Sequence, residues 1–115
     1  MIHKDFLLAD AEIPLISCDE LRDELLIYNL DETATNQLFS QFEKITGKAL
    51  NKMYKINELS GGQKVILMAL LAIYSPARKI RFQNLTQSLY PKRRQAIEEI
   101  IQNSGKEIVM DTEDD

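Results

Sequence analysis

The sequence predicts a small, mainly α-helical domain of four to five helices, with at most two short parallel strands. Residues 65–73 are all apolar, and a helix that is apolar on every face is typical of a buried central element. Apolar residues recur at helical spacing before this segment, and short alternating segments flank another helix after it. With 115 residues, 44% of them hydrophobic, the chain suffices for one modest core, so residues 1–115 are predicted to form a single domain.

Residues 1–16 are expected to lack a helix, and the first helix is expected after them. Residues 6–8 form the only apolar cluster before Pro14, so residues 1–16 are predicted to be extended or irregular. Ser17 and Glu20 have the spacing of a capping box, which predicts a helix over residues 18–28. Its buried face is expected to carry Leu21, Leu25 and Tyr28.

A second helix is predicted to begin at Asp31 and to end at Gly47. Aspartate favours the N-cap, and glycine readily takes the left-handed conformation that closes a helix. The basic segment 48–55 is expected to hold another helical turn or two. The apolar residues at helical spacing, from just before this helix to its end, are Leu30, Ala34, Leu38, Phe42 and Ile45.

The last half of the chain reads as helix, strand, helix, strand. The buried helix begins after Ser60 and ends before Pro76, and Lys79–Gln83 alternates as a short strand does. Pro91 suits the first position of the next helix, Gly105 closes it, and residues 107–110 form a second strand. Two such strands joined through a helix predict one right-handed parallel crossover, and the acidic residues 111–115 are expected not to pack. The last helix should turn Ala96, Ile97, Ile100 and Ile101 inward and Arg94, Glu98 and Gln102 outward.

Composition excludes several classes of function. The net charge of −4 disfavours a general nucleic-acid binder, and the longest apolar run, residues 65–74, is about half of a membrane span. Cys18 is the lone cysteine and no secretory signal precedes it, so a cytoplasmic location is expected. One histidine, His3, and one cysteine are too few for a metal site.

The segment Leu59-Ser60-Gly61-Gly62-Gln63 carries the functional argument. A serine hydroxyl and two glycine amides at a helix N-terminus form a cradle for an anion, helped by the helix dipole. Glycine lets the backbone approach a phosphate closely. The simpler alternative is that Ser60 is an ordinary N-cap and that the glycines only make a turn.

This LSGGQ segment resembles the signature motif of ABC-type ATPases. The resemblance covers Asp19 to Asp114, with residues 19–58 similar to the helical subdomain and residues 59–76 to the signature and its helix. Residues 77–115 look like a degenerate form of the region that follows in the family, in which Thr86 and Leu89 match. The resemblance therefore implies the helical subdomain of an ABC ATPase with a small strand content.

The departures from the family pattern imply that the chain does not hydrolyse ATP. Gln83 and Asn84 stand where the family has a metal-binding aspartate and a catalytic glutamate, and neutral amides are poor ligands for magnesium and cannot act as a general base. Glu113 stands at the position of the family's histidine, and Tyr90 replaces an aspartate. No catalytic residue and no metal ligand are therefore expected.

The phosphate-binding loop is also missing from the sequence. That loop needs two glycines five apart, then lysine and a hydroxyl residue. Lysine follows Gly47 and Gly105, but Ala49 and Glu107 stand where the hydroxyl residue belongs. The chain is expected to begin near the family's Q-loop, and the loss of both halves of the catalytic machinery suggests a naturally short gene product.

The resemblance predicts a non-catalytic partner of a complete ABC-type ATPase. Ser60, Gly61, Gly62 and Gln63 would contact ATP in trans, so ATP is expected only at an interface with that subunit or in a homodimer. A membrane would be reached only through a partner. Because the chain lacks much of the family's sheet, the 65–73 helix is expected to leave some apolar surface exposed for a partner to cover.

Three alternatives remain open at the level of the sequence. The chain is a protein-docking module without a nucleotide role, an inactive remnant, or an accessory to a DNA-repair or chromosome-type ABC ATPase. The last would use Arg78, Lys79, Arg81 and residues 92–94 as one basic patch, although solvated surface charge explains these residues more simply.

Overall fold

The computed structural model describes residues 6–10, 19–85 and 88–111. These residues form three strands and four α-helices, and a short 3-10 helix, Ile56–Glu58, precedes α3. In chain order the elements are β1 (Phe6–Asp10), α1 (Leu21–Ile27), α2 (Glu32–Thr46), α3 (Gly61–Tyr74), β2 (Lys79–Gln83), α4 (Pro91–Gln102) and β3 (Glu107–Asp111). The mainly helical fold with a small parallel sheet is confirmed.

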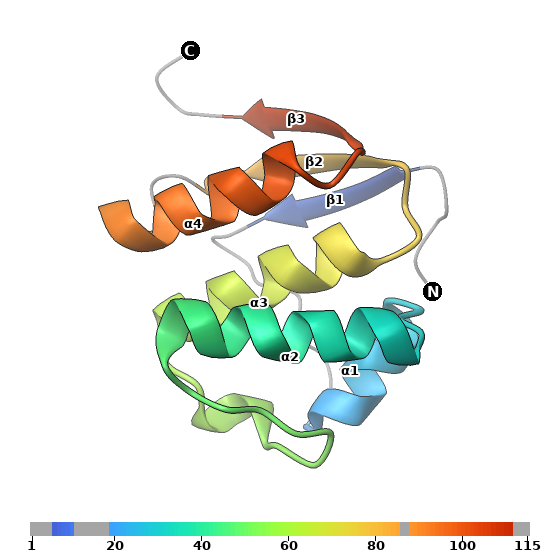
Figure 1. Cartoon of the computed structure of the whole chain (residues 1–115), viewed down its shortest axis with the longest axis vertical. Coiled ribbons are helices and arrows are strands. Elements are labelled where there is room, and N and C mark those ends of the chain that lie inside the picture. The colour runs from blue at the N-terminus through green and yellow to red at the C-terminus, as the bar shows by residue number, and fades with distance from the viewer. Residues whose placement is uncertain (1–5, 11–18, 86–87, 112–115) are drawn as a thin grey trace.

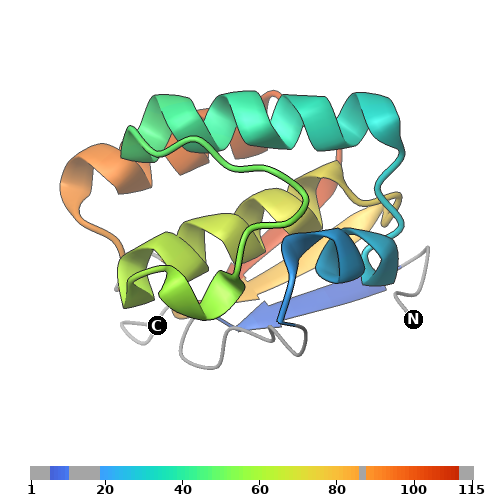
Figure 2. The same cartoon turned by 90° about the horizontal axis from the view of Figure 1, so that it is seen from below.

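The sheet has three parallel strands in the order β1-β2-β3, one more than the sequence predicted. Figure 1 shows α3 and α4 on one side of this sheet, with α2 on the far side of α3; Figure 2 shows the same layers from below. The added strand is β1, whose Phe6 and Leu8 pair with Lys79 and Arg81 of β2. Because these partners are more than seventy residues away, local pattern did not reveal β1.

Helix α3 is the centre of the core, as the sequence predicted. Each residue from 65 to 73 is at most 5% exposed, and α2 packs along the helix on the side away from the sheet. The expectation that α3 would leave apolar surface uncovered is wrong, because these two layers enclose it. Among the described residues, the large exposed apolar side chains lie elsewhere: Leu8, Leu26, Met53 and Tyr90.

Helix α1 starts three residues later than predicted, and the segment before Ile56 explains why. Its N-cap is Glu20, whose side chain makes no capping bond, while Ser17 lies outside the described residues. The backbone amides of Leu21 and Arg22 instead donate to the carbonyls of Tyr54 and Lys52. The orphan donors of the first helical turn are thus satisfied by another segment of the chain.

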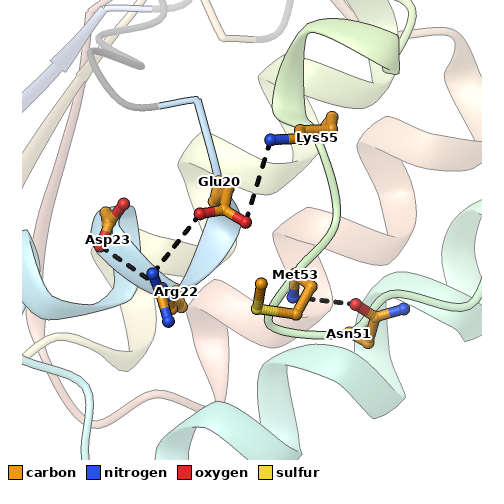
Figure 3. Close-up of polar contacts among 6 residues, drawn as sticks. All are labelled: Glu20, Arg22, Asp23, Asn51, Met53 and Lys55. Atoms are coloured by element: carbon orange, nitrogen blue, oxygen red, sulfur yellow. Dashed lines mark hydrogen bonds and ion pairs between the residues drawn. The ribbon is translucent and has the colours of Figure 1, made fainter.

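The same contacts keep residues 48–55 from forming the helical turns that were expected. Carbonyls of this segment accept bonds from α1, and the Asn51 side chain accepts a bond from the Met53 amide. Figure 3 shows the Glu20 carboxylate between Arg22 and Lys55, at 3.6 and 3.9 Å. Such partly exposed ion pairs add little stability, so the backbone bonds are the main link between the two segments.

Most helix ends agree with the local chemistry of the sequence. The Asp31 carboxylate accepts a bond from the Ala34 amide at 2.8 Å, and Gly47 closes α2 at φ 77°. Pro91 opens α4, as expected. Helix α4 ends at Gln102, before Gly105, which makes the turn into β3 at φ 72°.

The two faces of α4 are less distinct than the sequence predicted. Ile97 is fully buried and Gln102 is exposed, as expected. The predicted outward residues Arg94 and Glu98 are half-buried, as are the predicted inward residues Ala96, Ile100 and Ile101. Only Ile97 of this helix is fully buried, so the borders of its apolar face are partly open to solvent.

Lys106 joins the loops that precede β2 and β3. Its ammonium group donates to the carbonyls of Ser75, at 2.7 Å, and Ala77. Partial burial lowers the pKa of Lys106. The side chain thereby satisfies carbonyls that follow the end of α3, a frequent role for lysine at helix C-termini. No helix in the described part of the chain is long and apolar enough to cross a membrane.

The buried phenol of Tyr28 makes the fold sensitive to alkaline pH. Burial and the nearby Glu24 carboxylate raise the pKa of Tyr28 to about 12, whereas an unfolded tyrosine titrates near pH 10. Because the folded pKa is the higher one, this stabilisation is fully present below pH 10 and is lost as the pH rises towards 12. We expect a loss of roughly 2 kcal/mol in the free energy of unfolding.

Urea denaturation at pH 9 and pH 11.5 measures this loss. Other groups also titrate in this range, so the comparison is made with Tyr28→Phe, which keeps the ring and removes the ionisable hydroxyl. The variant should lose less stability over the same range. An equal loss in both proteins would contradict the assignment to Tyr28.

Candidate functional site

Ser60 begins α3 through a reciprocal pair of hydrogen bonds. Its hydroxyl accepts a bond from the Gln63 amide at 3.2 Å, and the Gln63 side-chain oxygen accepts one from the Ser60 amide at 3.0 Å. This is a complete capping box. Ser60 is therefore the N-cap of α3, as the simpler interpretation predicted. The side chains of Ser60 and Gln63 are both engaged in these capping bonds.

The two glycines of the segment are not needed for the path of the chain. Gly61 and Gly62 lie in the first turn of α3, and neither has a positive φ, so other residues could adopt this backbone. A Cβ atom on Gly61 would meet nothing within 4 Å. The glycines consequently leave the first turn of α3 bare and accessible, and Ser60 and Gly61 are exposed.

Gly62 has one close neighbour that sequence reasoning missed. A Cβ atom on Gly62 would lie 3.2 Å from Nη1 of Arg93, a residue in the first turn of α4. Figure 1 shows the first turns of α3 and α4 at the same end of the molecule as the carboxyl ends of the strands. The sequence contained one signal for the position of Arg93. A helix that follows a parallel strand starts at the carboxyl end of that strand, so the start of α4 was expected at the carboxyl end of β2.

Gln83 and Asn84, the amides that the resemblance set in place of acidic residues, lie at this same end. Gln83 is the last residue of β2, and Asn84 follows it at φ 59°, in the left-handed region that asparagine tolerates. Both are half-buried and both take part in polar contacts. The carboxyl edge of a parallel sheet is where ligands commonly bind, so these amides occupy a position from which they could meet one.

The loop between β2 and α4 contains further residues that the resemblance singled out. Leu89 is buried and anchors the loop after β2, whereas Tyr90 is 79% exposed. The Asn84 carbonyl accepts a bond from the Ser88 hydroxyl at 2.8 Å, which closes the loop. Thr86, Glu113, His3 and Cys18 lie outside the described residues, so the predictions made for them stay predictions.

The basic residues proposed for nucleic-acid binding do not form one patch. Ile80 and Phe82 face the helices and are buried, so Lys79 and Arg81 face the other side of the sheet. Lys79 is paired with Glu107 at 3.2 Å. Residues 92 and 93 instead face α2, on the helical side of the sheet.

Solved structures with the same arrangement decide the fold. A protein named for cobalt transport ATP binding superposes with a TM-score of 0.69, at 20% identity, over 96% of this chain. An ABC transporter ATP-binding protein from Pyrococcus furiosus gives a TM-score of 0.69 at 18% identity, also over 96% of this chain. The chain has the fold of part of an ABC transporter ATP-binding protein.

The similarity to ABC ATP-binding proteins is one of fold and covers only part of them. The chain spans 43% and 57% of the length of the two solved structures. No protein-family model matches the sequence, and no curated protein matches it either. What residues 59–63 do in this chain therefore depends on the chemistry of the site itself.

Proposed function

We propose that this chain is a non-hydrolysing, ABC ATPase-like partner protein that offers its signature segment in trans to a complete ABC-type ATPase. The bare first turn of α3 carries the proposal. Glycines at residues 61 and 62 are not required by the backbone conformation, and the space beside Gly61 is open. A partner surface that carries a nucleotide phosphate can approach this turn closely, which a side chain there would prevent.

The groups around this turn support contact with an anion. Ser60 holds the helix start rigidly, so the turn is formed before any ligand arrives. Arg93 adds a cation beside Gly62. A helix N-terminus and a guanidinium group both favour phosphate, the first through its dipole and the second through its charge.

The side chains at the end of β2 support the proposal that this chain alone does not hydrolyse ATP. Gln83 and Asn84 end β2 as neutral amides, which neither bind magnesium well nor accept a proton from water. The sequence also lacks a phosphate-binding loop. ATP would accordingly be held mainly by the partner, in the cytoplasm, and any contact with a membrane would go through that partner.

Affinity capture of the tagged full chain from its native cells, with and without ATP, tests the proposal. We expect recovery of an ATPase that contains an intact phosphate-binding loop, in larger amounts when ATP is present. The same eluate should hydrolyse ATP, whereas the purified chain should not. Recovery of no such ATPase, or of equal amounts with and without ATP, would contradict the trans-signature function.

A second candidate function, a docking module without a nucleotide role, is favoured by one groove. Arg22, Leu26 and Lys52 line a groove of about 350 Å³ between α1, α2 and the segment before Ile56. Leu26 is 70% exposed at its rim. An exposed leucine beside a groove is typical of a surface that binds another protein. A partner that is captured independently of ATP, and lost on Leu26→Asp, would support this function instead.

A further inference from the structure

We propose that the cleft between α2 and α4 is a binding site for a nucleotide, next to the signature segment, with Arg93 shared between the two. The cleft has a volume of about 530 Å³, within the range of small-molecule sites. Its α4 wall is one stripe of the helix, from Lys92 to Asn103, at the spacing of residues on one helical face. This stripe is about 16 Å long, enough for an extended nucleotide.

One end of the cleft is strongly cationic. Lys44 near the end of α2 and Lys92 and Arg93 in the first turn of α4 all line it. Glu99 is the one carboxylate in the lining, which leaves a net charge of +2 in a chain whose net charge is −4. The local charge is therefore opposite to that of the whole chain.

Among the described residues, no acidic side chain forms an ion pair with the cations of this cluster. Across residues 6–10, 19–85 and 88–111, the structure shows no ion pair for Lys44, Lys92 or Arg93. Three like charges at one end of a cleft repel one another, and an anion placed between them relieves this repulsion. Phosphate is the anion that lysine and arginine side chains bind best together, arginine through a bidentate fork.

The rest of the cleft suits a flat apolar group. Ile45 of α2 and Ala96 and Ile100 of α4 form an apolar wall next to the cations. Gln41 and Asn103 add side-chain amides, which can donate and accept hydrogen bonds at the edge of a base. The cleft therefore offers cations for phosphates, and apolar and amide side chains for a base.

Binding of ATP to the purified full chain, measured by calorimetry at low salt, tests this inference independently of any partner protein. We expect one ATP per chain, and weaker binding of both inorganic triphosphate and adenosine, because each offers only half of the contacts. Lys92→Gln combined with Arg93→Gln should weaken ATP binding by about a hundredfold, since each lost charged contact is worth about tenfold. Failure of the trans-signature proposal would leave these expectations unchanged.

Matched variants separate the cleft from general charge attraction. Lys55→Gln with Arg78→Gln removes the same charge at two exposed positions outside the cleft and should change ATP affinity less than threefold. Ala96→Leu should fill the cleft, so ATP affinity should fall while that of inorganic triphosphate is kept. Equal weakening by both double variants, no effect of Ala96→Leu, or no ATP binding to the folded wild-type chain would overturn the inference.

Discussion

Gly61→Phe is expected to abolish ATP-dependent association with the partner ATPase while leaving the fold intact. The phenyl ring would stand over the bare first turn of α3 and keep a phosphate from approaching its backbone. Recovery of the ATPase in the presence of ATP should fall at least a hundredfold. Nothing lies within 4 Å of the new Cβ atom, and glycine is a poor helix former, so the free energy of unfolding should stay equal or rise by up to about 1 kcal/mol.

The control for this variant is Asn36→Phe, which adds the same ring at an exposed position of α2. It should leave capture unchanged. Circular dichroism and urea denaturation of both variants show whether they fold. If Gly61→Phe still captures the ATPase with ATP, while folded, the signature segment does not form the interface.

Phe82→Ala is expected to cost about 3–5 kcal/mol of stability, the usual cost of truncating a buried aromatic ring. Phe82 lies on the central strand β2 and is fully buried against the helices. The free energy of unfolding of a domain of this kind is about 5–15 kcal/mol in total, so the variant should be partly unfolded at 37 °C. Urea denaturation at 20 °C measures the change.

Tyr90→Ala is the matched aromatic truncation at the surface, since Tyr90 is 79% exposed. Its free energy of unfolding should change by less than about 0.5 kcal/mol. A loss below about 1 kcal/mol for Phe82→Ala would mean that the sheet contributes little to the core. The helices would then hold the fold without it.

Three predicted boundaries that depend on a single local residue held, whereas the end of α4 predicted at Gly105 was wrong, because the helix ends at Gln102. Asp31 caps α2, Gly47 closes it, and Pro91 opens α4. These signals are local because the capping group and the backbone amide that it satisfies are three residues apart. The predicted start of α1 was wrong because it depends on distant residues. Its first backbone amides donate to the carbonyls of Tyr54 and Lys52, some thirty residues away.

The sequence predicted the residues of the signature segment but not the residues that surround it in the folded chain. The sequence identified Ser60 and both glycines, and it indicated an N-cap as the simpler alternative, which the structure contains. It did not reveal Arg93 beside Gly62, because these residues lie on different helices and meet only after α3 and α4 pack on the sheet. The cleft between α2 and α4 was missed for the same reason.

The sequence by itself determined the buried helix α3 and its start at Ser60, since apolar composition and capping act within a few residues. Tertiary structure alone decided that β1 is a strand. A five-residue segment cannot satisfy its backbone hydrogen bonds alone, and the bonds of β1 come from β2 across most of the chain. The packing of α2 against α4 likewise decided that Lys44, Lys92 and Arg93 meet. The positions of charged residues in the sequence do not show which of them will be neighbours in space.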